Sequence, residues 1–227
     1  MKGRSREDEL LDNPNVSPEE LLGSLNFMRQ VNELLGGHRA ILEYFSRQDL
    51  PETFTVLDIA CGGGDTPFAL AKWAGARGKR ARITAIDLQP LCVAYAAQNF
   101  SSPDILYLDH SAFDIERLGR FDYVTSSMFF HHLSDEDIVR LLRLMRKVAR
   151  RGWIVNDLYR GALNYAGAWF LGMLSGRPMI FNDAKLSVAR AFRPEDLERY
   201  RTAAGLSDAR IRRRPVFRIT LDGHGTD

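Results

Sequence analysis

Glycine and acidic residues gather in one short segment of the sequence, residues 56–67. The segment reads VLDIACGGGDTP, so an apolar run that contains Asp58 leads into three consecutive glycines. Glycines in such a turn let the backbone approach a ligand closely, because no Cβ atoms stand in the way. A further acidic residue, Asp87, follows Gly64 by 23 positions, close to the roughly 20 expected of a carboxylate that holds ribose hydroxyls. The segment therefore predicts a nucleoside-containing ligand.

Two details distinguish this turn from the turn of a nicotinamide-dependent dehydrogenase. The dinucleotide fingerprint has a third glycine three residues after its second, where helix and strand pack closely, and Pro67 occupies that position here. Asp58 also precedes the turn. A carboxylate there would repel a pyrophosphate, whereas it suits a ligand that carries a positive amino group and a sulfonium. The pattern therefore disfavours a dinucleotide.

Short apolar runs alternate with helical patterns from residue 54 onward. We expect strands at 54–59, 81–86, 105–108, 121–126 and 153–158, and helices at 67–76, 91–99 and 135–150. This alternation is typical of a largely parallel sheet with helices on both faces, so the predicted fold class is α/β. A helix at 194–204 and strands at 209–213 and 216–221 follow. The last two are joined too closely for a crossover and predict an antiparallel hairpin, in which the alternating second strand is half-buried.

A helical segment precedes this unit. Ser17-Pro18 is typical of a helix start and Gly36-Gly37 of a helix end, with Leu21, Leu25, Met28 and Leu35 on one face between them. A second short helix should carry residues 41–45. The segment either covers an edge of the sheet or forms a lid from which Arg29 or Asn32 reaches a bound ligand. We expect a helical cap over 1–50 and a ligand-binding domain over 51–227, with an insertion at about 160–192.

The ordered motifs resemble those of the class I methyltransferases that use S-adenosylmethionine (SAM). VLDIACGGGD resembles their first motif, and Ala85-Ile86-Asp87 resembles their second-strand acidic motif. The segment 107–110 (YLDH) is similar to their third motif, and FDYV at 121–124 followed by FFHHL at 129–133 is similar to their fourth. Ala60 departs from the pattern, since many relatives have glycine there. The resemblance implies a seven-stranded sheet, SAM as the cofactor and S-adenosylhomocysteine (SAH) as its product.

The resemblance also implies roles for the matching positions. The methionine part of SAM would lie against Asp58, Ala60, Gly62 and Gly64. Asp87 would hold the ribose, and Leu88 would lie beside the adenine ring. Asp109 and the backbone of His110 would read the adenine edge, and Ser126 would line the cofactor. Asp58, Asp87 and Asp109 have a structural alternative as strand-end carboxylates that cap a turn.

The acceptor side of the site is less defined. A phenol or enol acceptor must lose a proton, and His131 is the first candidate for the base, ahead of His132, Asp157 and Tyr159. A helix cap is the structural alternative for the histidines. Residues 160–192 are rich in aromatic and sulfur side chains, which suits either an apolar pocket or an amphipathic helix. Segments 181–197 and 27–37 resemble, more loosely, methyltransferases of quinone biosynthesis and polyketide tailoring. This implies a small aromatic or quinone-like acceptor, methylated on a hydroxyl oxygen or on an activated carbon.

Composition narrows the remaining alternatives. The net charge of +2 is low for a protein that binds nucleic acid, although a basic cluster at 210–214 keeps a nucleic-acid methyltransferase open as an alternative. A non-catalytic SAM-binding protein is another. The two cysteines, Cys61 and Cys92, form no zinc-binding pattern. We therefore expect no metal, a cytoplasmic location and no membrane span, because the N-terminal stretch is charged and no apolar run is long enough. The oligomeric state stays open.

Overall fold

A sheet of seven strands forms the centre of the computed structural model, which describes residues 3–13 and 16–226. Positions 1, 2, 14 and 15 of the charged N-terminal stretch lie outside the described residues, as does position 227. The strands are β1 (Thr53–Ile59), β2 (Arg80–Asp87), β3 (Ile105–Asp109), β4 (Phe121–Ser127), β5 (Ala149–Leu158), β6 (Arg210–Arg214) and β7 (Arg218–His224). Their order is β3-β2-β1-β4-β5-β7-β6. β1 to β5 pair in parallel, and β7 runs antiparallel to β5 and β6, which confirms the predicted α/β sheet and its hairpin.

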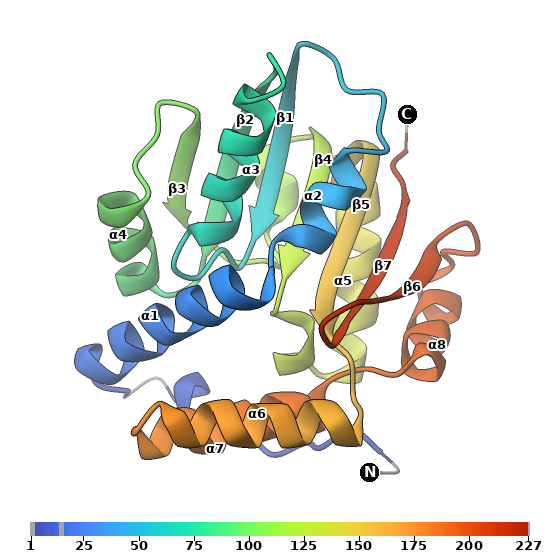
Figure 1. The fold of residues 1–227 in the computed structure, drawn as a ribbon. Coiled ribbons are helices and arrows are strands. Elements are labelled where there is room, and N and C mark those ends of the chain that lie inside the picture. The colour runs from blue at the N-terminus through green and yellow to red at the C-terminus, as the bar shows by residue number, and fades with distance from the viewer. Residues whose placement is uncertain (1–2, 14–15, 227) are drawn as a thin grey trace.

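Helices cover both faces of this sheet and the end at which the parallel strands finish. The α-helices are α1 (Pro18–Leu35), α2 (Arg39–Phe45), α3 (Asp65–Gly75), α4 (Pro90–Asn99), α5 (Asp135–Val148), α6 (Ala162–Leu174), α7 (Pro178–Arg190) and α8 (Pro194–Ala204). Single 3-10 turns form η1 (Leu10–Asp12), η2 (Ile115–Leu118) and η3 (Phe130–His132). Figure 1 shows α1 and the α6–α7 pair lying beyond the arrowheads of β1 and β5. These helices therefore enclose the edge where ligands bind in open α/β sheets.

Two apolar clusters hold the sheet between its helices. On one face, α2 and α3 pack against the sheet through residues that include Phe45, Phe54 and Leu70. On the other face, α5 and α8 contribute Leu141, Met145, Leu197 and their neighbours to a larger cluster. Within the described residues, none of the helices has both the length and the apolar character needed to cross a membrane.

The N-terminal helix begins and ends as the sequence predicts. The Ser17 side chain accepts a hydrogen bond from the backbone N–H of Glu20, which caps the first turn of α1. At the other end Gly36 adopts a left-handed conformation with φ of 65°. Leu21 and Leu25 are buried and pack with Cys92 of α4. The apolar face of α1 thus lies toward the sheet end.

The boundary between α5 and β5 lies earlier than predicted. α5 ends at Val148 and β5 begins at Ala149, whereas we expected a helix to residue 150 and a strand from 153. Ala149 pairs with Phe121 of β4, and the N–H groups of Gly225 and Thr226 donate to carbonyls of residues 151 and 149. These long-range hydrogen bonds draw residues 149–152 into the sheet, and no local pattern reports them.

The burial of β7 also differs from the prediction. The strand begins at Arg218 rather than at residue 216, because Val216 and Phe217 form a turn with positive φ. Arg218, Thr220 and Asp222 are buried together with the apolar residues between them. The strand is therefore not half-buried.

Candidate active site

The glycine turn after β1 has the open backbone that the sequence predicts. Ala60, Gly62 and Gly64 all adopt positive φ, at 56°, 52° and 83°. Ala60 thus occupies a conformation that favours glycine. α3 begins at Asp65, two residues earlier than expected. The turn exposes backbone at Ala60, Cys61, Gly62 and Gly63 to a large cavity.

Gly64 has a packing role in this turn. A Cβ atom built at Gly64 would lie 2.7 Å from Cβ of Ala96 in α4 and 3.0 Å from the hydroxyl of Tyr107 in β3. Gly64 does not line the cavity. Its missing side chain lets α3 begin close against its neighbours, so its predicted contact with the methionine part of SAM stays a prediction.

Asp58 places a buried carboxylate at the wall of the cavity. The residue is 3% exposed, and its Oδ1 accepts a hydrogen bond of 2.6 Å from the hydroxyl of Thr125 in β4. Burial raises the pKa of Asp58 to about 7, and the Thr125 hydrogen bond opposes that rise only in part. No cationic side chain of residues 3–13 or 16–226 forms an ion pair with it. A ligand ammonium would therefore be a favourable partner.

Asp87 is fixed at the end of β2 by the turn itself. Its Oδ2 accepts a hydrogen bond from the Gly62 N–H at 2.8 Å, and its Oδ1 accepts one from the Gln89 N–H at 3.0 Å. Burial raises the pKa of Asp87 although these N–H groups oppose the rise. The geometry joins the two carboxylate motifs of the sequence into one site.

The residues expected to contact adenine lie outside the enclosed cavity. Leu88 is 70% exposed, and Asp109 is exposed at the end of β3 beside Asp87, its register partner. His110 is half-buried, with Nδ1 2.9 Å from the carbonyl of Ser111. Leu88, Asp109 and His110 thus lie outside the cavity. Their roles toward adenine stay predictions.

Ser126 lies in β4, next to the residues that line the cavity. It is fully buried, and its hydroxyl donates to the carbonyl of Ile59 at 3.1 Å. Its side chain therefore tethers β4 to β1, while Ser127 and Met128 line the cavity. The predicted role of Ser126 toward the cofactor stays a prediction.

One continuous cavity runs from the glycine turn to the α6–α7 pair. Its cofactor end is formed by Asp58, Ala60 and Gly62, and α1 covers it with Met28, Arg29, Asn32 and Leu35. The far end is formed by residues of α6 and α7 and by the η1 segment. The position of α1 supports the lid interpretation of the N-terminal helix, since Arg29 and Asn32 both reach the cavity.

The aromatic residues of the 160–192 region do not form the pocket. Trp169, Phe170 and Met173 are exposed on α6. Smaller residues of the same two helices line the cavity instead, among them Gly167, Ala168, Leu171, Ile180 and Ala184. Residues of the 160–192 region therefore line the cavity, although not through its aromatic side chains, and their role toward an acceptor stays a prediction.

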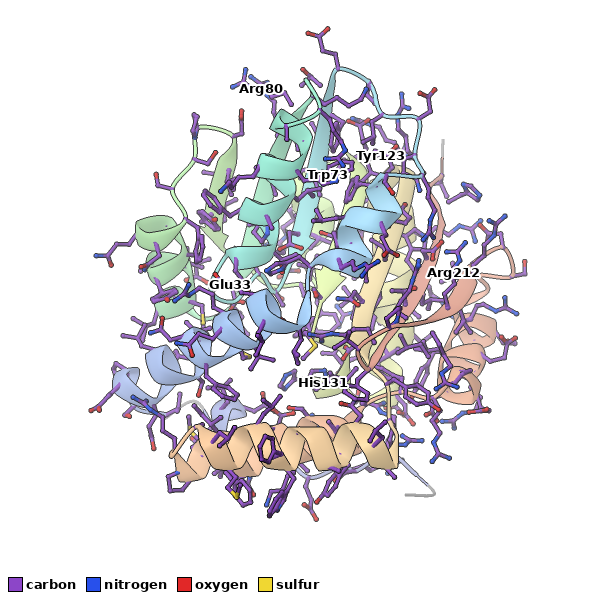
Figure 2. All side chains as sticks on the ribbon, viewed as in Figure 1. Glu33, Trp73, Arg80, Tyr123, His131 and Arg212 are labelled. Carbon is purple, nitrogen blue, oxygen red and sulfur yellow. The ribbon has the colours of Figure 1, made fainter. Side chains whose placement is uncertain are left out.

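His131 lies in a buried chain of ionisable side chains at the far end of the cavity. Its Nδ1 is 2.7 Å from Oδ1 of Asp157, and both residues are at most 2% exposed. Its Nε2 is 3.6 Å from Oε1 of Glu9. Figure 2 places His131 between the sheet end and the α6–α7 pair. His131 itself does not line the cavity, whereas Glu9 does.

Glu9 is a functional candidate that the sequence analysis missed. It is 5% exposed, its Oε2 accepts a hydrogen bond of 2.9 Å from Ser187, and its Oε1 has no hydrogen-bond partner among the described residues. Burial raises the pKa of Glu9 to about 7. Asp157 differs: burial alone would raise its pKa, but His131 holds that pKa below the usual value. No local motif marks Glu9, because its partners lie more than 100 positions away.

The same cluster has side chains that could hold a cation. Ligand atoms of Glu9, His131 and His132 lie within 4.8 Å of one another. Nδ1 of His132 is 2.8 Å from Oδ1 of Asp12. The expected absence of a metal therefore stays a prediction.

Two other sequence candidates have structural partners. Tyr159 does not line the cavity, and the guanidinium of Arg213 stacks on its ring at 4.1 Å. In the predicted basic cluster, Arg212 pairs with Asp222 and Arg214 pairs with Glu43. These contacts reduce the free positive charge that a nucleic-acid backbone would need.

Comparisons with known proteins agree with the fold. The family model described as a methyltransferase domain matches residues 56–152. The ubiquinone biosynthesis O-methyltransferase of Coxiella burnetii is 26% identical over 172 residues, which cover 73% of this chain and 68% of that protein.

Solved structures share the same fold at low sequence identity. The plantazolicin methyltransferase BpumL in complex with SAH has a TM-score of 0.68 at 13% identity, covering 93% of this chain and 91% of its own. A SAM-dependent methyltransferase from Aquifex aeolicus has a TM-score of 0.62 at 17% identity, covering 92% and 99%. Magnesium protoporphyrin IX methyltransferase from Synechocystis PCC 6803 with bound SAH has a TM-score of 0.58 at 15% identity, covering 85% and 83%.

The residues present fit SAM. The turn offers bare backbone at Gly62 and Gly63, Asp58 offers a buried carboxylate without a cationic partner, and Asp87 is oriented by two N–H groups. With the sheet order and the match of residues 56–152 to a methyltransferase domain, the chain has the fold and the site features of a SAM-dependent methyltransferase.

Proposed function

We propose that this methyltransferase transfers the methyl group of SAM to a hydroxyl oxygen of a small aromatic or quinone-like molecule in the cytoplasm. The cavity that joins the glycine turn to the buried Glu9–His131–Asp157 chain carries this proposal. A hydroxyl acceptor needs a group that removes its proton, and the chain supplies one at the cavity wall. The name of the Coxiella relative, a ubiquinone O-methyltransferase, supports an acceptor of this kind.

SAM, when bound, supplies a methyl group that is already activated by the positive sulfur. The protein must therefore align the acceptor and exclude water. Asp58 would pair with the amino group of SAM and Asp87 with its ribose. Met28 and Leu35 of α1 and Leu171 of α6 give the cavity its apolar cover.

Glu9 would receive the proton of the acceptor hydroxyl, and His131 would position Glu9 and share the proton. Asp157 orients His131 through the 2.7 Å contact with Nδ1. The carboxylate form of Glu9 is required, and its raised pKa of about 7 makes it a stronger base than an ordinary glutamate at neutral pH. Our first choice of base, His131, thus becomes a positioning residue in this proposal.

The test is methyl transfer from SAM to catechol and related dihydroxybenzenes, followed as SAH formation. We expect Glu9→Gln to lower kcat/KM about 100-fold and to leave the affinity for SAM unchanged, because Glu9 lies away from the glycine turn. Wild-type kcat/KM should fall as the pH drops below about 7, since Glu9 becomes protonated. His131→Asn should shift the acid limb of this profile. The exposed Glu195 provides the control variant Glu195→Gln.

Several outcomes would contradict parts of the proposal. Full activity of Glu9→Gln would remove it as the base. Loss of activity in EDTA that a divalent cation restores would assign Glu9, His131 and His132 to a metal instead. A product methylated on a ring carbon, or methylation of a DNA or RNA duplex but of no small acceptor, would favour the alternative reactions. SAM binding without turnover on any acceptor would indicate a non-catalytic protein.

A further inference from the structure

Arg218 is a buried cation at the wall of the cavity. It is the first residue of β7 and pairs in register with Leu158, the last residue of β5. It is 8% exposed and lines the cavity together with Leu158 and Phe217. The guanidinium is thus withdrawn from solvent but open to whatever the cavity holds.

The hydrogen-bond partners of Arg218 are neutral. Its Nη2 donates to Oδ1 of Asn32 in α1 at 3.1 Å, and its Nη1 contacts the sulfur of Met128. Among residues 3–13 and 16–226, no carboxylate lies within 4.0 Å of its guanidinium. The acids with the largest electrostatic effect on it are Asp157 and Asp65.

Both of these acids have other partners. Asp157 pairs with His131 at 2.7 Å. Asp65 accepts from Asn32 at 3.0 Å and lies 3.5 Å from Nε2 of His38. Neither carboxylate is therefore placed to neutralise the guanidinium directly.

The other buried arginines of this protein show what Arg218 lacks. Arg160 pairs with Asp196 at 2.9 Å, and Arg190 pairs with Asp8 at 3.3 Å. Arg4, at a side-chain exposure of 10%, pairs with Asp135 at 3.0 Å. A buried charge without a counter-ion is unfavourable, and a guanidinium keeps its proton even when burial lowers its pKa, as it does for Arg218. The expected counter-ion is thus a ligand.

The surroundings of Arg218 indicate the chemistry of that ligand. Ala168 and Leu171 of α6 line the cavity together with Leu158 and Phe217, so its wall is largely apolar there. A guanidinium presents a planar set of donors that matches a carboxylate with two parallel hydrogen bonds. An aromatic or apolar body with one carboxylate would satisfy both features.

The strand order favours the acceptor over SAM as the source of this carboxylate. β4 and β5 lie between β1, which carries the glycine turn, and β7. At about 4.8 Å per strand, the β7 backbone is some 14 Å from β1 across the sheet. The guanidinium also reaches Asn32, which donates to Asp65 beside the glycine turn, so the experiment below measures SAH affinity to distinguish the two sources.

We propose that the acceptor carries a carboxylate, distinct from the hydroxyl to be methylated, and that Arg218 binds it and thereby selects acidic aromatic molecules. This inference rests on the proposed function for the reaction at the hydroxyl. The binding preference can be measured without turnover. The carboxylate inference and the proposed methyl transfer can therefore fail independently of each other.

The experiment is calorimetric binding of 3,4-dihydroxybenzoate and of its methyl ester to the protein saturated with SAH. The wild type should bind the acid at least tenfold more tightly than the ester. Arg218→Met should lose this preference, and Arg218→Lys should retain part of it. The exposed Arg210 on the neighbouring strand β6 gives the control Arg210→Met, which should behave as the wild type. If Arg218→Met does not fold, the acid and the ester can still be compared on the wild type and on Arg218→Lys. That comparison tests whether Arg218 binds the carboxylate.

Three results would overturn the proposal. Equal binding of acid and ester by the wild type, or binding of neither, would show that the cavity does not select a carboxylate. A fall in SAH affinity in Arg218→Met with the acid preference intact would assign Arg218 to the carboxylate of the cofactor. An unchanged preference and unchanged SAH affinity would leave Arg218 as a structural residue. Acid preference without any methylation of 3,4-dihydroxybenzoate would contradict the proposed function and leave this inference intact.

Discussion

Two buried ionisable residues of the cavity wall have no ion-pair partner among residues 3–13 and 16–226. Asp58 is a carboxylate beside the glycine turn, and Arg218 is a guanidinium at the start of β7. Burying either charge without a partner costs free energy. Each therefore indicates a ligand group of the opposite charge. A zwitterionic cofactor and an acidic acceptor would together neutralise both.

The affinity for SAM should depend on pH through Asp58. In the free protein its pKa is about 7, and pairing with the ammonium of SAM should lower it. Below pH 7 the carboxyl must lose a proton before it can pair, so SAM binding should weaken as the pH falls. By linkage the dissociation constant should be roughly twentyfold larger at pH 5.5 than at pH 7.5.

Calorimetric titrations across this range, with Asp58→Asn as the comparison, test the prediction. The variant should bind SAM weakly and with little dependence on pH. A wild-type affinity that stays flat between these pH values would mean that Asp58 does not pair with the cofactor.

Sequence motifs identified Asp58, Gly62 and Asp87 as candidate site residues but did not identify Glu9 or Arg218. Asp58, Gly62 and Asp87 come together because parallel strands finish at one edge of a sheet, which follows from their order in the chain. Glu9 and Arg218 reach the cavity from the two ends of the chain. Their environment depends on contacts between residues far apart in the sequence, which no local pattern contains.

At the scale of elements, α1 and the α6–α7 pair convert an open sheet edge into a cavity. The apolar face of α1 was predictable from its periodicity, and its caps were predictable from Ser17 and Gly36. The direction of α6 was not, because Trp169 and Phe170 are apolar residues that face outward. The division into a cap over 1–50 and a domain over 51–227 stays a prediction, and α2, inside the cap range, packs on the sheet.

The close approach of α3 to α4 should make Gly64 irreplaceable. Gly64→Ala would impose a positive φ on alanine and place its Cβ 2.7 Å from that of Ala96. We expect a loss of about 2–4 kcal/mol in the free energy of unfolding. Gly78 has a similar φ of 67° with no atom within 4 Å of a built Cβ, so Gly78→Ala should cost only about 1–2 kcal/mol.

Urea unfolding of the two variants measures the difference, which isolates the packing contribution from the backbone conformation. Equal losses in the two variants would show that α4 yields to the added methyl group and that the contact is not a constraint.

At the scale of the whole molecule, the order of the strands determines how far apart the two reactants are held. β1 and β2 carry the residues proposed to bind the cofactor, β5 and β7 carry residues proposed to act on the acceptor side, and β4 lies between the two groups. The apolar and polar patterns predicted this sheet and its hairpin correctly. They did not predict the early start of β5 or the full burial of β7, because both depend on pairing between distant strands.

The most direct test of the central claim is calorimetric titration of the purified protein with SAM and with SAH, with NADH as the comparison. The account predicts micromolar binding of SAM and SAH and no binding of NADH, because the turn suits an ammonium and a ribose but lacks the third glycine of a dinucleotide site. Binding of NADH, or of neither SAM nor SAH, would contradict the identification of the glycine turn as a SAM site.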